Sequence, residues 1–141
     1  MKKLYLLDTN AVSEIMKPAP RKAFVEKLTE NEERCVISST TWNELVYGMN
    51  LLDAGKKKSF LSAFLFDEVQ RKFEIIPYDS HAALIHADLR MRLKDAGTPV
   101  EYEDTEIASV AIANQLILVT SNARHFEAVS RVDSIFRYET W

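Results

Sequence analysis

Three acidic residues, Asp8, Glu44 and Asp104, stand where an apolar run ends or a helix is expected to begin. If the fold brings them together, each pair about 4 Å apart repels by on the order of 4 kcal/mol at an effective dielectric of about 20. Such a cluster needs a cation. Carboxylate oxygens without Cys or His suit the hard ions Mg²⁺ and Mn²⁺. The three residues therefore predict a divalent-metal site, on condition that the fold places them side by side.

Each of these carboxylates also has a purely structural interpretation. Asp8 could cap the helix that follows it, and Asp104 could be the N-cap of the helix that contains Ile107. Glu44 comes three residues after Thr41, which is the spacing of a capping box, so it could instead bond to the start of its own helix. The arrangement of the elements in space decides between the two interpretations.

Further polar residues accompany the carboxylates. Thr120 and Asn122 directly follow the last long apolar run and offer a hydroxyl and an amide oxygen, although both are also ordinary turn residues. Thr9 and Asn10 directly follow Asp8. We expect Asn122 to be the fourth polar residue of the site, beside the three carboxylates. Thr9, Asn10 and Thr120 are expected to hydrogen-bond to these site residues and orient them.

Apolar and β-branched runs separated by stretches of helical periodicity set the expected fold. The expected strands are residues 4–7, 35–37 and 73–76, then 116–119, with an edge strand at 134–138. The expected helices are residues 10–16, 21–32, 41–55, 56–72, 80–96 and 104–114. This alternation predicts an α/β fold with a parallel sheet between helical layers, in a single domain over residues 1–141. Asp8 then lies at the strand end where ligands bind in such sheets, and Trp141 is expected to fold back onto the core.

Composition narrows the class of protein. The chain has 141 residues, 47% of them hydrophobic, and a formal net charge of −3, which fits one compact domain and argues against a basic nucleic-acid binder, though not against a local basic patch. Cys35 is the only cysteine, so no disulfide can form within the chain, and we expect a buried thiol in a cytoplasmic protein. The apolar run that Asp8 ends is too short for a signal peptide, and no run is long enough to span a membrane.

Two other catalytic classes fit less well. His81 and His86 lie on the expected helix 80–96 without Ser or Cys partners at the spacing of a triad, so they are predicted to be structural. Asp8 could be a phosphoryl acceptor, as in haloacid-dehalogenase-like enzymes. Those enzymes favour a second Asp two residues further on, where this chain has Asn10.

Four stretches of the chain, taken in order, resemble the motifs of the PIN-domain family, and within it the VapC and FitB-type toxins of bacterial toxin–antitoxin pairs. They are Leu6-Leu7-Asp8-Thr9-Asn10, Thr41 to Glu44-Leu45 with Gly48, Gly97-Thr98-Pro99 leading to Asp104 and Ile107-Ala108, and Leu118 to Asn122 with His125-Phe126. The resemblance implies a three-layer α/β/α domain with a central, mainly parallel five-stranded sheet. It also implies Mg²⁺- or Mn²⁺-dependent ribonuclease activity, homodimerisation, and inhibition by a cognate DNA-binding antitoxin of the VapB kind.

Carried over residue by residue, the resemblance makes Asp8, Glu44 and Asp104 the metal ligands. One or two bound ions would activate a water for attack on an RNA phosphodiester, so that no protein nucleophile is needed. Asn122 falls where many relatives have a fourth acidic residue and others an Asn. This difference keeps an alternative open, in which a weakly active or inactive domain binds an antitoxin or RNA.

Contacts to RNA must come from local positive charge, because an acidic cleft repels phosphates. The candidates nearest the motifs are Arg124, His125 and Lys17, and the other basic positions are Arg21, Lys22 and residues 56–58. Some apolar side chains exceed what one sheet face needs and are expected at a partner interface: Trp42, Val46, Met49, Phe64 and Phe66.

Overall fold

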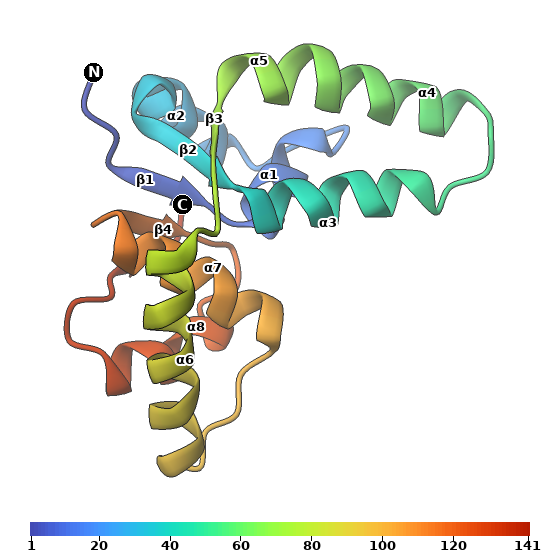
Figure 1. Ribbon diagram of the computed structural model, residues 1–141. Helices are drawn as coiled ribbons and strands as arrows, with labels where there is room; N and C mark the ends of the chain where they lie inside the picture. Colours follow the sequence, from blue (N-terminus) through green and yellow to red (C-terminus); the bar gives the residue numbers. More distant parts are fainter.

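The computed structural model describes residues 1–141 and contains one sheet of five parallel strands in the order β3-β2-β1-β4-β5 (Figure 1). The strands are β1 (Tyr5–Leu7), β2 (Cys35–Ser38), β3 (Glu74–Ile76), β4 (Ile117–Val119) and β5 (Tyr138–Glu139). Helices cover both faces of this sheet. The predicted α/β fold with a parallel sheet between helical layers is therefore confirmed.

Neighbouring residues of each strand enter different hydrophobic cores, because successive side chains of a strand point to opposite faces. Leu6 belongs to the core under α6 (Ser80–Asp95), α7 (Tyr102–Ala113) and α8 (Arg124–Val132). Leu7 belongs to the core under α1 (Thr9–Met16), α2 (Lys22–Asn31) and α3 (Ser39–Asn50). Burial on both faces explains why the central strands are uninterrupted apolar runs.

A helical arm extends from the second layer. Helix α4 (Lys56–Ala63) continues through a π-helical segment, η2 (Phe64–Val69), into α5 (Gln70–Lys72), and it runs beside α3 away from the sheet (Figure 1). The predicted helix over 56–72 is thus confirmed, although its π-helical segment was not predicted. Phe60 is 61% exposed because the arm extends beyond the sheet.

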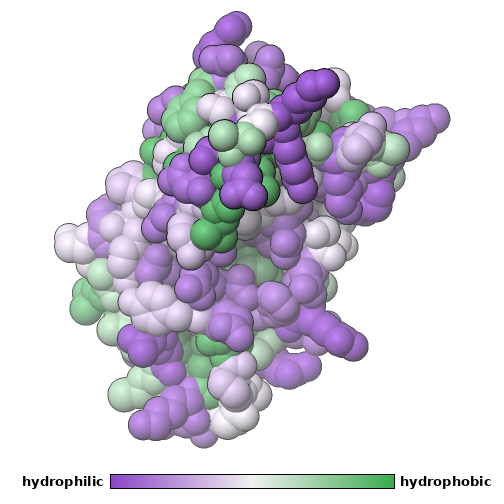
Figure 2. Space-filling view, turned by 90° about the vertical axis from the view of Figure 1, so that its right-hand side faces the viewer, coloured by the Kyte–Doolittle hydropathy of each residue, from purple (hydrophilic) through white to green (hydrophobic).

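The arm carries exposed apolar side chains. Figure 2 shows hydrophobic patches among hydrophilic side chains in its upper half, where the arm points toward the viewer. Phe66 is 43% exposed and packs edge-on against Trp42, with ring centroids 5.5 Å apart. Met49, in contrast, is buried in the core, so it is not available to the expected partner interface.

The C-terminal region differs most from expectation. Residues 134–138 were expected to form the edge strand, but only Tyr138 and Glu139 pair with β4. The reason is that Oδ1 of Asp133 accepts hydrogen bonds from the backbone N–H groups of Ile135 and Phe136, which holds those residues in a turn. Helix α8 was not predicted at all. Trp141 does fold back, since its ring lies edge-on to Tyr5 at 5.0 Å.

The order of the strands creates a crevice between β1 and β4. The chain winds outward from β1 through β2 to β3, and then returns to β4 on the other side of β1. In open α/β sheets this reversal marks the place where ligands bind. Asp8 lies there, and its backbone N–H donates to the carbonyl oxygen of Val119 at 3.0 Å. None of the helices is both long enough and apolar enough to cross a membrane.

Candidate functional site

A cavity of about 240 Å³ opens at this crevice. All three predicted carboxylates line it, together with the predicted supporting residues Thr9 and Asn10. The full lining is Asp8, Thr9, Asn10, Glu44, Glu101, Glu103, Asp104, Ile107 and His125. Residues that are far apart in the sequence therefore meet in one place, and we call this place the acidic cavity.

Asp8 both caps a helix and faces the acidic cavity. Its Oδ1 accepts a hydrogen bond from the backbone N–H of Ala11 at 2.7 Å, so the structural interpretation as N-cap of α1 is correct. Only 3% of the residue is exposed, and burial raises the pKa of the carboxyl to about 6. The Thr120 hydroxyl and the Ala11 N–H lower that pKa, whereas the charges of Asp104 and Glu44 raise it further.

Glu44 does not belong to a capping box. Helix α3 begins earlier than expected, at Ser39, and the hydroxyl of Ser38 accepts from the backbone N–H of Thr41 at 3.1 Å. Glu44 is therefore free to turn toward the cavity, where its Oε1 accepts from the hydroxyl of Thr9 at 2.6 Å. Burial raises the pKa of Glu44, and the hydrogen bond from Thr9 opposes that shift.

Asp104 is not the N-cap that the sequence suggested. Helix α7 begins at Tyr102, which places Asp104 inside its first turn rather than before it. The Oδ2 atom of Asp104 lies 2.8 Å from Nδ1 of His125 on α8. Burial raises the pKa of Asp104, and the His125 ring opposes that shift.

Glu101 and Glu103 were missed as site residues. Both line the acidic cavity on either side of Tyr102, and their charges raise the pKa of Asp104. The signal was present in the sequence, where Glu101, Glu103 and Asp104 are close neighbours. It was overlooked because the helix was expected to begin at Asp104, which would have left the two glutamates in a loop.

Asn122, Thr120, Arg124 and Lys17 do not line the cavity, and neither do the other basic positions Arg21, Lys22 and residues 56–58. The amide Nδ2 of Asn122 lies 3.1 Å from Nε2 of His125, so Asn122 is linked to Asp104 through that ring. Thr120 is buried, and its hydroxyl accepts from the backbone N–H of Asn122 at 3.0 Å. Arg124 is exposed at the start of α8, and the ammonium group of Lys17 is paired with Glu14 at 2.9 Å.

The donors of the acidic cavity fit a hard divalent cation in their chemistry. They are carboxylates that raise one another's pKa, and a bound cation would remove that repulsion. In the present side-chain arrangement, however, no group of three or more His, Cys, Asp or Glu residues could hold one ion. Glu44 is bonded to Thr9, and Asp104 contacts His125. These two contacts orient the carboxylates, and Mg²⁺ that is bound by one or two carboxylates keeps water as its remaining ligands.

The chain is similar to known proteins over nearly its whole length. The family model described as PIN domain matches residues 5–132. The chain is 32% identical over 138 residues to the tRNA(fMet)-specific endonuclease VapC of Salmonella typhimurium, with 97% of each chain covered. It is 34% identical over 128 residues to Toxin FitB of Neisseria gonorrhoeae, covering 89% of this chain and 92% of that protein. Its fold matches a chain of the DNA-bound VapBC crystal structure from Salmonella typhimurium with a TM-score of 0.84 and 32% identity, covering 100% and 99% of the two chains.

Proposed function

The chain belongs to the PIN-domain family, and from this premise we propose that it is a divalent-metal-dependent endoribonuclease, the toxin of a toxin–antitoxin pair. The observation that carries the proposal is the convergence of Asp8, Glu44 and Asp104 on one cavity at the crevice of the sheet. The relatives with the names VapC and FitB support the assignment to RNA cleavage and to a toxin.

In this proposal Asp8, Glu44 and Asp104 hold Mg²⁺ or Mn²⁺. Such an ion would supply an activated water and would neutralise charge on the scissile phosphate. The protein's own part is to fix the carboxylates: the Ala11 N–H holds Asp8, the Thr9 hydroxyl holds Glu44, and the His125 ring holds Asp104. The lining contains no Ser or Cys that could act as a nucleophile.

Asn122 acts indirectly in this scheme. Its amide contacts the side of the His125 ring away from Asp104, so it fixes the orientation of the ring. Thr120 stabilises the turn that contains Asn122, because the Thr120 hydroxyl accepts a hydrogen bond from the backbone N–H of Asn122. We therefore assign both residues to positioning the ligands, and Asn10 to the wall of the cavity.

We further propose a cognate DNA-binding antitoxin as the partner, and RNA as the substrate. The support for the antitoxin is that the similar Salmonella chain was crystallised in a DNA-bound VapBC complex. Homodimerisation is part of the same proposal, with the exposed apolar side chains of the arm, such as Phe66 and Phe60, as the available surface. Light scattering of the purified chain tests the dimer.

The decisive experiment uses the purified chain freed of antitoxin. We expect it to cleave RNA with Mg²⁺ or Mn²⁺ and not in excess EDTA, and tRNA(fMet) is the first RNA to test because the Salmonella relative is named for it. Asp8→Asn should abolish cleavage, whereas Asp53→Asn, in the exposed loop between α3 and α4, should not. Cleavage in EDTA, or full activity of Asp8→Asn, contradicts the metal mechanism.

A second candidate function is a binding module that cleaves RNA weakly or not at all. The observation in its favour is that no three acidic or His side chains are arranged to hold an ion together. Such a module binds its antitoxin or RNA, yet no metal makes it cleave. The same cleavage assay, run beside an antitoxin-binding assay, therefore separates the two candidates.

A further inference from the structure

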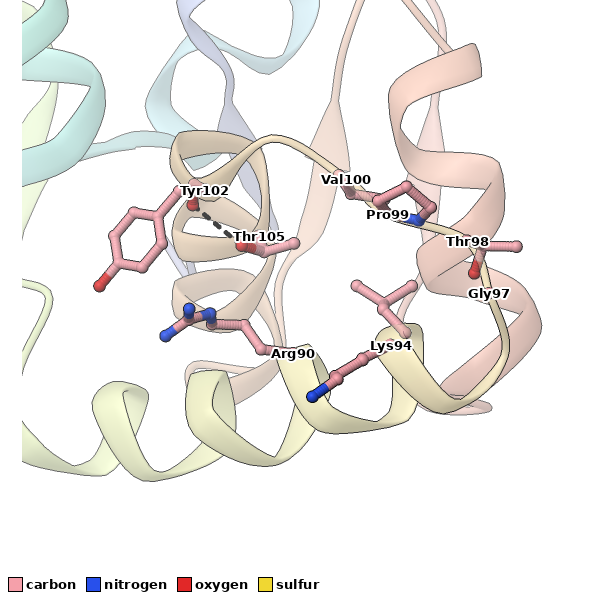
Figure 3. A pocket seen from close by; sticks show the side chains of 9 residues that line it. Arg90, Lys94, Gly97, Thr98, Pro99, Val100, Tyr102 and Thr105 are labelled. Carbon is pink, nitrogen blue, oxygen red and sulfur yellow. Dashed lines mark hydrogen bonds between the residues drawn. The ribbon is translucent and has the colours of Figure 1, made fainter.

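A second and larger cavity, of about 390 Å³, lies between α6 and the start of α7. Figure 3 shows Arg90 extending from α6 toward the ring of Tyr102 on α7, while the loop through Thr98 and Pro99 crosses from one helix to the other. The lining is Arg90, Leu93, Lys94, Gly97, Thr98, Pro99, Val100, Tyr102 and Thr105. We call it the basic cavity, because its lining contains two cations and no carboxylate.

The two cations of the basic cavity are not used inside the protein. Arg92, which lies between them on α6, is paired with Asp88 and Asp133. Arg90 and Lys94 form no ion pair, and Arg90 only rests over the Tyr102 ring, 4.9 Å from its centroid. In a protein with a net charge of −3, two free cations beside an exposed aromatic ring are available to an anionic ligand.

The loop of the cavity offers another polar group. The Oγ1 atom of Thr98 is buried and has no hydrogen-bond partner. An unpartnered buried hydroxyl destabilises the loop that carries it. Gly97, with φ of +69°, ends α6 in a left-handed turn and thereby sets the course of this loop.

A surface path joins the basic cavity to the acidic one. Tyr102 also lines a third hollow, of about 450 Å³, which contains Tyr47, Glu44 and Glu103. Glu44 and Glu103 are at the same time walls of the acidic cavity. The three hollows are therefore joined by shared walls: Glu44 and Glu103 line both the acidic cavity and the third hollow, which also contains Glu106, and the exposed ring of Tyr102 lines both the third hollow and the basic cavity.

We propose that Arg90 and Lys94 bind a backbone phosphate of single-stranded RNA next to the nucleotide held at the acidic cavity, with Tyr102 in contact with the intervening base or sugar. This inference rests on the proposed ribonuclease function and names the part of the site that attracts the substrate. The acidic cavity repels phosphates, so binding of the RNA strand needs positively charged side chains near the cavity. Arginine and lysine supply it to phosphates, and aromatic rings supply a stacking surface for unpaired bases.

The test measures RNA binding and its dependence on salt. The probe is a fluorescein-labelled single-stranded RNA of mixed sequence, bound to full-length protein that carries Asp8→Asn to prevent cleavage. The double variant Arg90→Gln/Lys94→Gln is compared with Arg71→Gln/Lys27→Gln, which removes the same charge from exposed positions on α5 and α2. Thermal unfolding of each protein shows that it is folded.

We expect the Arg90/Lys94 variant to bind about 10- to 100-fold more weakly at about 50 mM salt, and the control variant to weaken by no more than about 2-fold. The slope of log K against log salt concentration should become shallower by about 0.7 for each phosphate that the variant no longer neutralises. Arg90→Lys retains the charge and should retain the slope. Tyr102→Ala should weaken binding about tenfold without changing the slope, because a ring carries no charge.

Several results would overturn the inference. Equal slopes for the two double variants place the phosphate contact elsewhere, and if the wild type cleaves RNA normally, the proposed function stands without this subsite. Loss of antitoxin binding by the Arg90/Lys94 variant, with RNA binding unchanged, assigns the basic cavity to an acidic segment of the antitoxin. Absence of RNA binding by every form rejects both this subsite and the proposed RNA substrate.

Discussion

The Nε2 atom of His86 lies 2.7 Å from the hydroxyl oxygen of Thr105, so a fully buried ring on α6 is bonded to the first turns of α7. The same hydroxyl donates its only proton to the carbonyl of Tyr102 at 2.9 Å. His86 must therefore donate from Nε2 and accept at Nδ1 from the hydroxyl of Tyr78, 2.8 Å away. Burial lowers the pKa of His86, which agrees with a neutral ring. The prediction that His86 is structural is thus confirmed.

Removal of the Thr105 hydroxyl should destabilise the protein. Thr105→Val keeps the shape of the side chain but leaves a buried N–H of His86 without an acceptor, at a cost of about 1–3 kcal/mol in the free energy of unfolding. Urea denaturation measures the loss. Thr29→Val is the matched control, because its hydroxyl bonds to a backbone carbonyl on the exposed surface, and it should change stability by no more than about 0.5 kcal/mol. Equal effects of the two substitutions would contradict a stabilising role for the buried hydrogen bonds that link Tyr78, His86 and Thr105.

Asp8→Asn should stabilise the metal-free protein at neutral pH. Burial raises the pKa of Asp8 from 3.8 to about 6, so the folded state binds this proton more tightly than the unfolded state. The stability that protonated Asp8 provides is complete below 3.8 and is lost as the pH rises through about 6. Asn avoids that loss and can still cap α1, which predicts a gain on the order of 1–3 kcal/mol at about pH 7.5.

Thermal or urea denaturation in EDTA checks this gain. Asp8→Asn should lose its advantage over the wild type at about pH 4, where Asp8 is largely protonated in the folded protein. The exposed substitution Asp53→Asn should show neither the gain nor its dependence on pH. If Asp8→Asn is less stable than the wild type at neutral pH, burial of the ionised Asp8 carboxylate does not destabilise the folded protein.

His125→Ala should weaken metal binding and cleavage. The ring contacts Asp104 at 2.8 Å and opposes the rise in the pKa of that carboxyl, so its removal should raise the pKa of Asp104 further. Loss of a group that orients a ligand typically reduces metal affinity or activity by about 10- to 100-fold. Titration calorimetry with Mn²⁺ measures the affinity, and NMR titration measures the pKa. His81→Ala, an exposed position on α6, is the control and should match the wild type.

Two glycines should respond to alanine in opposite directions. Gly97 has φ of +69°, a left-handed conformation that is strained for alanine, so Gly97→Ala should destabilise the protein by about 1 kcal/mol. Gly48 lies inside α3 with nothing within 4 Å of an added Cβ, so Gly48→Ala should stabilise it by about 0.5–1 kcal/mol. Melting curves of both variants test the prediction, and effects of the same sign would contradict it.

Much of the fold could be predicted because burial on both faces of the sheet leaves a direct mark on the sequence. The runs at β1 and β4 are apolar for that reason, and Asp8 ends the first of them. Helix α8 left a weaker mark. It has nine residues, one more than α1, but it buries only Phe126 and Val129, so few positions indicate a buried helical face.

The site could be predicted in part. Carboxylates at strand ends and helix starts pointed to Asp8, Glu44 and Asp104, which do share a cavity. The first residue of a helix is harder to predict from the sequence. Capping depends on which of several neighbouring Ser and Thr side chains accepts hydrogen bonds from the free N–H groups of the first turn. This is why Ser38 was overlooked as the cap of α3, and why Glu101 and Glu103 were overlooked as site residues.

The use of Arg90 and Lys94 could not be read from the sequence at all. Whether a cation is free depends on its partners across the fold, and Arg92 on the same helix is paired with Asp133, which is 41 residues away. The reverse holds for Lys17 and Arg21. They were plausible RNA contacts in the sequence, but in the folded chain both interact with Glu14.

The acidic cavity takes its walls from widely separated parts of the chain, with Asp8 near the beginning and His125 near the end. A ribosome that has just begun the last third of the chain therefore carries a nascent protein without Asp104, without β4 and without α8. Such a fragment has neither the third carboxylate nor the far side of the crevice. The order of synthesis thus delays assembly of the site until most of the chain has been made.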